Sequence, residues 1–182
     1  TTFLNVLADY IPKTERVITI EDSAELQIHG IENLVRMEVR QADGDGVSNV
    51  TLRDLIRTSL RMRPDRIIVG EVRGEEALDM IQSMNTGHDG SLSTGHANSP
   101  QDMLSRLETM ALFASDIPIQ AIRKQIASSI DIIVQLERLR DRSRRVTAIA
   151  EVLDCTEDAY ILNPIFEFHE QDNLVMESSS YG

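Results

Sequence analysis

The sequence predicts an α/β protein, with a mostly parallel sheet flanked by helices and a C-terminal antiparallel extension. Three observations support this class. Strand-like and amphipathic helical segments alternate along residues 1–113. The run RIIVGEV (66–72) is continuously apolar, which is typical of strands covered on both faces of a parallel sheet. Residues 130–168 contain three strand-like segments joined by polar turns, which favours an antiparallel meander.

The first elements follow from local sequence patterns. Residues 2–10 place apolar side chains on one helical face, and Pro12 ends that pattern. RVITIED (16–22) is expected to be a buried strand that ends in two acids. LVRMEVR (34–40) alternates apolar and charged residues, which predicts an edge strand with one solvent-exposed face. The Gly- and Asp-rich segment 41–49 has no apolar anchor and predicts a mobile loop.

The later elements have recognisable start and stop signals. Thr51 is expected to cap a helix that runs to Met62 and is stopped by Pro64. The further expected elements are a helix at 75–85, a strand at 90–97, helices at 99–113 and 118–129, and strands at 130–139, 144–153 and 159–168. At 182 residues the chain is long enough to bury a full core, so a single domain is expected.

Composition and charge exclude several classes of function. Hydrophobic residues make up 41% and charged residues 26%, which is ordinary for a globular protein. The formal net charge of −12 repels phosphate backbones and aromatic residues are only 4%, so nucleic-acid binding is disfavoured. Cys155 is the single cysteine, which rules out a disulfide within this chain and favours a reducing compartment. No apolar run approaches the roughly 18 residues of a membrane span, so no membrane insertion is expected.

One dense basic stretch, ERLRDRSRRV, stands out from this acidic background. Its arginines are Arg138, Arg140, Arg142, Arg144 and Arg145. The strand–turn–strand spacing favours a solvated hairpin tip or a subunit contact over a nucleic-acid site.

Acidic residues close two of the predicted parallel strands. Glu71 follows the apolar run of residues 66–69, and Glu21 and Asp22 end the strand at 16–22. The carboxyl edge of a parallel sheet is where open α/β folds hold their ligands. Two such strand ends can hold Mg²⁺ through its waters and orient an attacking water. The alternative is that these acids only favour a turn or the amino end of the next helix.

Two histidines flank a short predicted strand in MNTGHDGSLSTGHANSP. His88 and His96 do not share a helix face, and a transition-metal site would need a third ligand, for which Asp89 is the only near candidate. His96, at the end of the strand, is better placed to donate a hydrogen bond to a phosphate oxygen. Serine hydrolysis is disfavoured because no Gly-flanked nucleophile turn is present.

Together these segments resemble the type II/type IV secretion ATPase superfamily, and most closely its CpaF-like branch of tight-adherence (Flp) pilus assembly ATPases. VITIEDSAEL resembles the acidic box of the family, LRMRPDRIIVGEVRGEEA its Walker B segment, and MNTGHDGSLSTGHANSP its His box. AIRKQIASSIDIIVQLERLRDRSRRVTAIAEV resembles the C-terminal strands of the branch. The resemblance implies that residues 1–182 are part of a RecA-like P-loop domain. In it, about 1–113 would form the nucleotide-binding core and 114–182 the C-terminal helix and antiparallel strands.

The resemblance also implies an activity and partners. The parent protein would be a cytoplasmic motor at the inner membrane that hydrolyses ATP with Mg²⁺. It would act as a homo-oligomer, in a hexameric ring. The motor would power pilus assembly or protein secretion through an inner-membrane platform protein.

Site residues are carried over by position. Glu71 would be the catalytic carboxylate that orients or activates water. Gly70 stands where many P-loop enzymes have an Asp linked to Mg²⁺, so Glu21 is the expected second acid and would contact the metal through water. His96 would approach the γ-phosphate. The other residues expected to support nucleotide binding are Asp22, Arg73, with a positioning or intersubunit role, and His88.

Thr1 and Thr2 resemble the last two residues of the family's phosphate loop. The Thr1 hydroxyl would then coordinate Mg²⁺, and the glycines and lysine of the loop would precede Thr1 in the parent protein. Such a loop binds through backbone N–H groups and the lysine, and each charge-assisted hydrogen bond contributes about 1.5–3 kcal/mol. Residues 1–182 alone are therefore expected to bind ATP poorly and not to hydrolyse it, whereas the parent protein would do both.

Two alternatives stay open from the sequence. In the first, the parent protein is a conjugation or type IV secretion ATPase that moves protein or DNA. In the second, the chain is a non-catalytic unit for ring assembly or platform docking, in which the acids and histidines have no chemical role.

Overall fold

The computed structural model describes residues 1–42 and 48–168. The predicted loop at 41–49 therefore lies mainly outside the described residues. The elements in chain order are α1 (Thr2–Ala8), β1 (Arg16–Glu21), β2 (Asn33–Glu38), α2 (Leu52–Ser59), the 3-10 turn η1 (Leu60–Met62), β3 (Arg66–Val69), α3 (Glu76–Met84), β4 (Leu92–Ser93), α4 (Pro100–Ala114), α5 (Ile119–Ser129), β5 (Ile132–Arg138), β6 (Arg144–Cys155) and β7 (Tyr160–Glu167).

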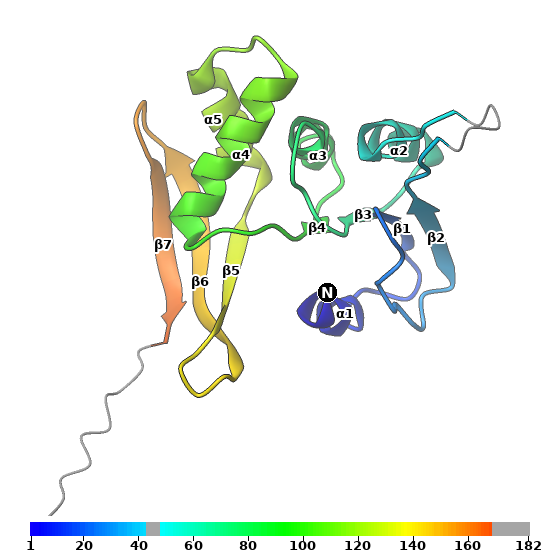
Figure 1. Ribbon diagram of the computed structural model, residues 1–182, viewed down its shortest axis with the longest axis horizontal. Coiled ribbons are helices and arrows are strands. Elements are labelled where there is room, and N and C mark those ends of the chain that lie inside the picture. Colours follow the sequence, from blue (N-terminus) through cyan, green and yellow to red (C-terminus); the bar gives the residue numbers. More distant parts are fainter. Residues whose placement is uncertain (43–47, 169–182) are drawn as a thin grey trace, which may run out of the picture.

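The first four strands form a parallel sheet in the order β2–β1–β3–β4. Helix α1 covers one face of this sheet, and α2 and α3 cover the other (Figure 1). β2 lies at the edge and alternates between half-buried and exposed residues, which confirms the predicted edge strand. The α/β class with a parallel sheet is therefore confirmed.

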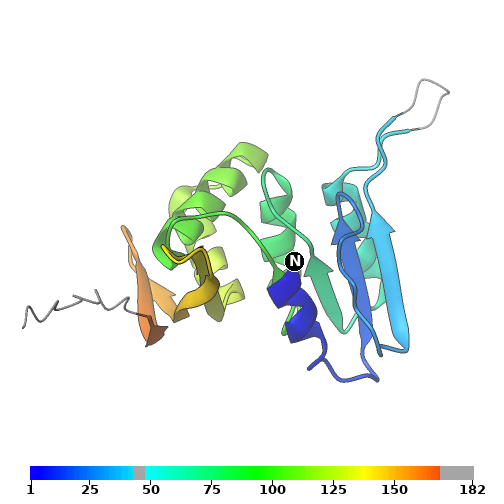
Figure 2. The same cartoon turned by 60° about the horizontal axis from the view of Figure 1, so that its bottom comes forward.

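Burial on both faces explains the continuous apolar run of the central strands. Val17 and Ile68 pack with Leu4 of α1 in one cluster. Their neighbours Ile18 and Val69 point to the opposite face and belong to the larger cluster with α2 and α3. Successive side chains of a strand point to opposite faces, so both sets must be apolar here. Figure 2 shows α1, in dark blue, beside these strands.

Two strands are shorter than the sequence predicts. β3 ends at Val69 instead of residue 72, and β4 spans two residues instead of 90–97. Beyond the regular ladder the chain stays paired through single bonds. The Gly70 N–H donates to the Ile20 carbonyl (2.8 Å), and the Val72 N–H donates to the Thr94 carbonyl (3.0 Å). These bonds hold the strand ends in place, although the residues beyond Val69 and Ser93 are no longer part of a regular ladder.

The helix after the loop begins as predicted. Thr51 caps α2 with a reciprocal capping box, in which its hydroxyl accepts from the Asp54 N–H (3.2 Å) and the Asp54 carboxylate accepts from the Thr51 N–H (3.0 Å). These bonds to Thr51 lower the pKa of the Asp54 carboxyl. On the neighbouring helix, the buried Asp79 accepts from Arg53 (2.6 Å) and Arg57 (2.7 Å), which fixes α3 against α2.

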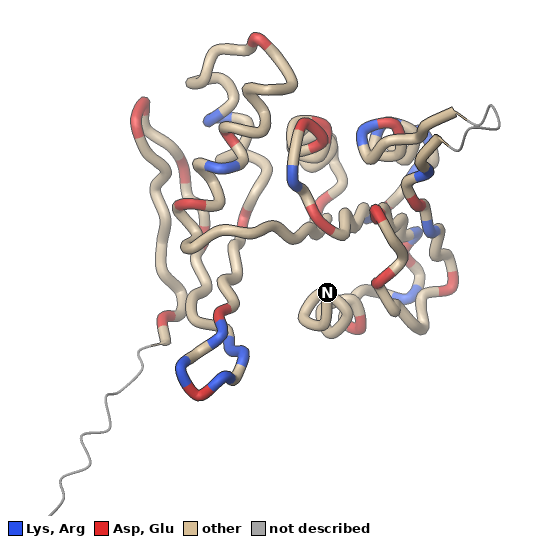
Figure 3. The backbone as a smooth tube through the Cα atoms, viewed as in Figure 1, with Lys and Arg blue, Asp and Glu red and all other residues tan. Residues whose placement is uncertain are grey.

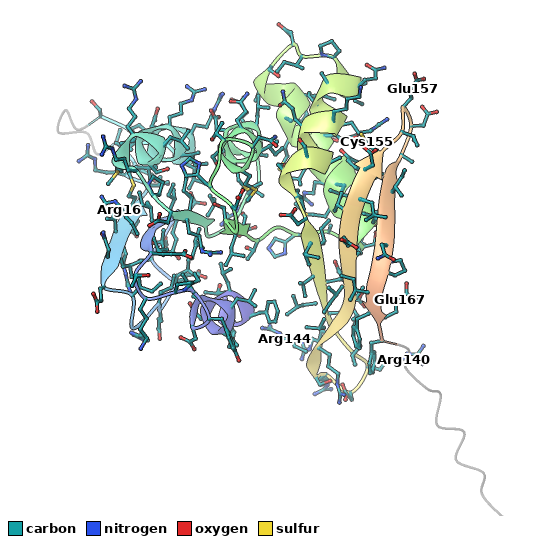
Figure 4. All side chains as sticks on the ribbon, turned by 180° about the vertical axis from the view of Figure 1, so that it is seen from behind. Arg16, Arg140, Arg144, Cys155, Glu157 and Glu167 are labelled. Atoms are coloured by element: carbon teal, nitrogen blue, oxygen red, sulfur yellow. The ribbon has the colours of Figure 1, made fainter. Side chains whose placement is uncertain are left out.

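The C-terminal strands form a second sheet in the order β5–β6–β7, and every pairing in it is antiparallel. Helices α4 and α5 lie between this sheet and α3 (Figure 1). The arginine-rich stretch forms the turn between β5 and β6, where the Leu139 N–H donates to the Ser143 carbonyl. The predicted hairpin is confirmed, and its basic residues gather at one end of the sheet (Figure 3). Arg140 and Arg144 mark that end in Figure 4, far from Arg16 on the parallel sheet.

A buried ion pair joins the two helices that cover the second sheet. Arg123 of α5 donates to both carboxylate oxygens of Glu108 on α4, at 2.6 and 3.2 Å. Arg123 also contacts the Glu157 carbonyl oxygen, and its guanidinium lies 5.9 Å from the ring centre of Tyr160. Burial raises the pKa of the Tyr160 hydroxyl well above its usual range, so it stays protonated. The pair therefore anchors α4 and α5 to the β6–β7 turn.

In residues 1–42 and 48–168, no helix combines the length and the hydrophobicity that crossing a bilayer requires.

The Arg123–Glu108 pair predicts a large loss of stability when one partner is removed. Arg123→Ala leaves Glu108, about nine-tenths buried, without its counter-charge, and should lower the free energy of unfolding by about 3–5 kcal/mol. Urea denaturation measures this loss. Lys124→Ala, one position along and exposed, is the matched control and should change stability by less than about 0.5 kcal/mol. A comparable loss in both variants, or none in Arg123→Ala, would contradict the role of the pair.

Candidate functional site

Glu71 stands at the carboxyl edge of the parallel sheet, two residues after β3 ends. One carboxylate oxygen, Oε1, lies 3.1 Å from His96 Nε2, and the other lies 3.1 Å from Arg73 Nη2. Arg73 Nη2 is also 3.4 Å from Asp22 Oδ2, just beyond β1. The side chain of Glu71 is 25% exposed, while Arg73 and His96 are 61% and 81% exposed. The structure thus brings four of the predicted residues into one cluster.

Glu21 lies beside this cluster as the last residue of β1 and is only 6% exposed. Its Oε1 accepts hydrogen bonds from the backbone N–H groups of Glu25 (3.0 Å) and Leu26 (2.9 Å). A Cβ at Gly70 would lie 3.0 Å from Glu21 Cγ, which is tighter than nearly all real contacts. The glycine at position 70 therefore leaves room for the carboxylate of the neighbouring strand.

Thr1 joins the same edge through a second acid. Its hydroxyl donates to Glu25 Oε2 at 2.9 Å, and its carbonyl accepts from the Asn5 N–H at the start of α1. Because Glu25 also donates its N–H to Glu21, Thr1 and Glu21 are connected through one residue. Thr2 is the exposed first residue of α1 and lies next to this chain of contacts.

His88 is not part of the cluster. It follows α3, and its Nδ1 lies 3.1 Å from the Ser83 carbonyl oxygen and 3.4 Å from Thr86 Oγ1. This loop leads into the amino end of β4, where the Gly90 carbonyl contacts Arg66 at the start of β3. His88 therefore lies toward the opposite edge of the sheet from Glu71. Its expected support of nucleotide binding stays a prediction, and its contacts within the described residues do not favour it.

Asp65 lies at that opposite edge too, and its carboxylate accepts from the Arg16 N–H at 2.7 Å. This bond ties the start of β1 to the residue before β3. Asp65 therefore has a structural contact at the edge opposite Glu71.

Sequence reasoning assigned no role to three residues that support the cluster. Glu25 accepts a hydrogen bond from the Thr1 hydroxyl. Its position four residues after Glu21 is the sequence feature that could have indicated this role. Thr94 donates its hydroxyl to the Gly70 carbonyl at 2.5 Å, which holds the strand ends before Glu71 and His96 together. Gln135 of β5 donates to the Ala97 carbonyl at 3.3 Å. No local pattern identifies such a contact across 38 residues.

A shallow hollow of about 500 Å³ adjoins the cluster on the side of Arg73. It is lined by Asp22, Val39, Gln41, Asn49, Thr51, Leu52, Arg53, Arg73, Gly74, Glu75 and Glu76. Glu71 and His96 do not line it, so it borders the reactive groups instead of enclosing them. Most of its lining residues are polar or charged.

The cluster has the donors and acceptors that phosphate chemistry uses. Glu71 is a partly exposed acceptor whose two oxygens are each oriented by a nitrogen donor. Arg73 and His96 are exposed donors that match phosphate oxygens. Within the described residues, no three His, Cys, Asp or Glu side chains converge as a protein-only metal cage. Mg²⁺ does not need one, since it keeps several waters and uses one or two carboxylates together with phosphates.

Comparison with known proteins places the chain in a family. A family model described as "Type II/IV secretion system protein" matches residues 1–172. The type IV secretion system protein PtlH of Bordetella pertussis is 36% identical over 148 residues, which cover 80% of this chain and 44% of PtlH.

Solved structures agree with this match. The VirB11 ATPase of the Brucella suis type IV secretion system, crystallised in complex with sulphate, superposes with a TM-score of 0.73 at 32% identity, over 82% of this chain and 44% of VirB11. The pilus retraction motor PilT with bound ADP has a TM-score of 0.55 at 23% identity, over 86% and 44% of the two chains, which shows a shared fold.

The chain spans less than half of the length of each of these three proteins. The match nevertheless extends over nearly all of its own residues. This chain belongs to the type II/IV secretion system protein family, and its fold is that of the VirB11 ATPase.

Proposed function

We propose that the chain forms part of the catalytic core of an ATP-hydrolysing motor for pilus assembly or protein secretion, of the CpaF-like type. The observation that carries the proposal is the position of Glu71. It is a partly exposed carboxylate, oriented by His96 and Arg73, at the sheet edge that also carries Glu21 and Thr1. The relatives named as a type IV secretion protein and a VirB11 ATPase support the same class.

Mg²⁺-ATP would supply the electrophilic phosphorus and a metal that neutralises the phosphate charge. Glu71 would hold the attacking water and take up its proton, for which a carboxylate with one face open to solvent is suited. Arg73 and His96 now bond to Glu71, and both side chains are exposed enough to turn toward a phosphate oxygen. Asp22 would keep Arg73 near the site in either position.

Glu21 and Thr1 would serve the metal side of the site. The Glu21 side chain packs against Gly70, so a carboxylate at position 70 would require Glu21 to move, and the acid of β1 takes up that space. Backbone N–H groups satisfy Glu21 Oε1, which fixes the carboxylate group in the buried strand end. Its contact with Mg²⁺ would run through water, and the Thr1 hydroxyl would exchange its bond to Glu25 for the metal.

The exposure of Arg73 and His96 also bears on how the parent protein assembles. Arg73 and His96 are too exposed to enclose a nucleotide by themselves, so further groups must complete the site. We propose that they come from the rest of the parent protein and from neighbouring copies in a hexameric ring. The motor would work in the cytoplasm on an inner-membrane platform protein. The net charge of −12 gives no reason to add nucleic acid to these partners.

Glu71→Gln in the full-length protein tests the proposed chemistry. The amide keeps the shape but cannot take up a proton, so the rate of ATP hydrolysis should fall by about 10²–10⁴-fold while ATP still binds. Phosphate release and equilibrium nucleotide binding are the two measurements. Glu32→Gln, the same change at an exposed position before β2, is the control and should hydrolyse ATP normally. Unchanged hydrolysis in Glu71→Gln, or loss of binding together with hydrolysis, would instead favour a structural role for Glu71.

Glu21→Gln tests the metal side of the site. The amide oxygen still accepts the two backbone N–H groups but carries no charge, so the Mg²⁺ concentration for half-maximal hydrolysis should rise about tenfold, the equivalent of about 1.4 kcal/mol. A Mg²⁺ titration of hydrolysis measures this. The control is Glu38→Gln, at the residue of β2 that pairs with Glu21. It should not change the Mg²⁺ concentration for half-maximal hydrolysis. Equal shifts in both variants would show a general field effect and contradict a specific role of Glu21.

A further inference from the structure

The chain between β4 and α4 carries His96 across the space between the two sheets (Figure 1). On its near side this linker is attached to the parallel sheet. The Thr94 carbonyl accepts from the Val72 N–H at 3.0 Å, and the Thr94 hydroxyl donates to the Gly70 carbonyl at 2.5 Å. These two bonds place the backbone before His96 in register with the backbone around Glu71.

On its far side the linker is attached to the antiparallel sheet. Gln135 Nε2 of β5 donates to the carbonyl oxygen of Ala97 at 3.3 Å, in a half-buried position. Ala97 directly follows His96. The imidazole of His96 is 81% exposed, so packing does not hold it, and the anchors of its backbone determine where it can reach.

An irregularity of the second sheet coincides with this contact. Along the β5–β6 ladder, Gln135 pairs with Ala148 but Leu136 pairs with Val146, which leaves Thr147 as an extra residue. Such bulges bend a strand and re-aim side chains, and they are common next to active sites. The bulge begins at Gln135. Among the described residues of β5, this is the one whose side chain is seen to bond the linker that carries His96.

We propose that Gln135 is a positioning residue, which sets the place of His96 against Glu71 by holding the Ala97 carbonyl. Through this bond, a shift of the antiparallel sheet relative to the parallel one displaces His96 at the site. The inference rests on the proposed function, because His96 must act in hydrolysis for its position to affect the rate.

Gln135→Glu in the full-length protein removes the donor at nearly constant shape and turns an acceptor toward the Ala97 carbonyl. A displacement of about 1 Å at a reacting group can cost about 100-fold, so we expect kcat for ATP hydrolysis to fall by about tenfold with little change in KM. Gln135→Lys restores an N–H donor and should recover most of the rate. Gln101→Glu, the same change at an exposed position on the first turn of α4, is the control and should behave as wild type.

A double-mutant cycle with His96→Ala separates positioning from general damage to the fold. If Gln135 acts through His96, then Gln135→Glu should change kcat by less than about twofold once His96 is alanine. A tenfold loss that persists in the His96→Ala background, or no loss in Gln135→Glu alone, overturns the inference. If His96→Ala itself leaves kcat unchanged, the proposed site fails and the inference fails with it. If His96→Ala lowers kcat and Gln135→Glu does not, only the inference fails.

Discussion

The pairing of β1 with β3 is the constraint on which the candidate site depends. The two strands run parallel at the centre of the sheet, and their carboxyl ends meet at one edge. Side chains on both faces of both strands are buried, so a one-residue slip would exchange side chains between the two packed clusters and disrupt both. Glu21 at the end of one strand therefore packs closely on Gly70 at the end of the other. The acids reach one edge because the core below them allows a single register.

This constraint explains which parts of the structure could be predicted from the sequence. The continuous apolar runs and the capping signal at Thr51 are local patterns, and they correctly predicted a parallel sheet with helices on both faces. The grouping of Glu71 with Asp22 followed from the same logic, since strand ends of a parallel sheet share an edge. Arg73 was expected there only from the family resemblance. The sequence pattern predicted longer strands than the structure shows at β3 and β4. There, single hydrogen bonds such as Thr94 to Gly70 keep the chain extended, and they leave no periodic signal.

The contacts that the sequence could not predict are long-range and polar. The strand predicted between His88 and His96 is present as β4 and carries them toward opposite edges of the sheet, although the resemblance implied a nucleotide-binding role for both. Arg123 looks like an ordinary charged helix residue, but it is buried against Glu108 because α4 and α5 cross at that point. Gln135 meets Ala97 only because the linker between β4 and α4 passes β5. In each case tertiary arrangement decides the partner, and local composition does not.

The balance of charge at the sheet edge bears on how such a site can bind an anion. Three carboxylates, from Glu21, Asp22 and Glu71, stand against the guanidinium of Arg73 and the imidazole of His96. Near a protein surface, two unit charges 4 Å apart interact by about 4 kcal/mol, so this edge by itself repels a polyphosphate. Arg73 and His96 currently offset the acids and cannot serve a phosphate at the same time. In the proposed site, Mg²⁺ held near Glu21 would offset part of this negative charge, and Arg73 and His96 would then be free to turn toward a phosphate. In that arrangement the acids would favour a metal-bound anion over a free one.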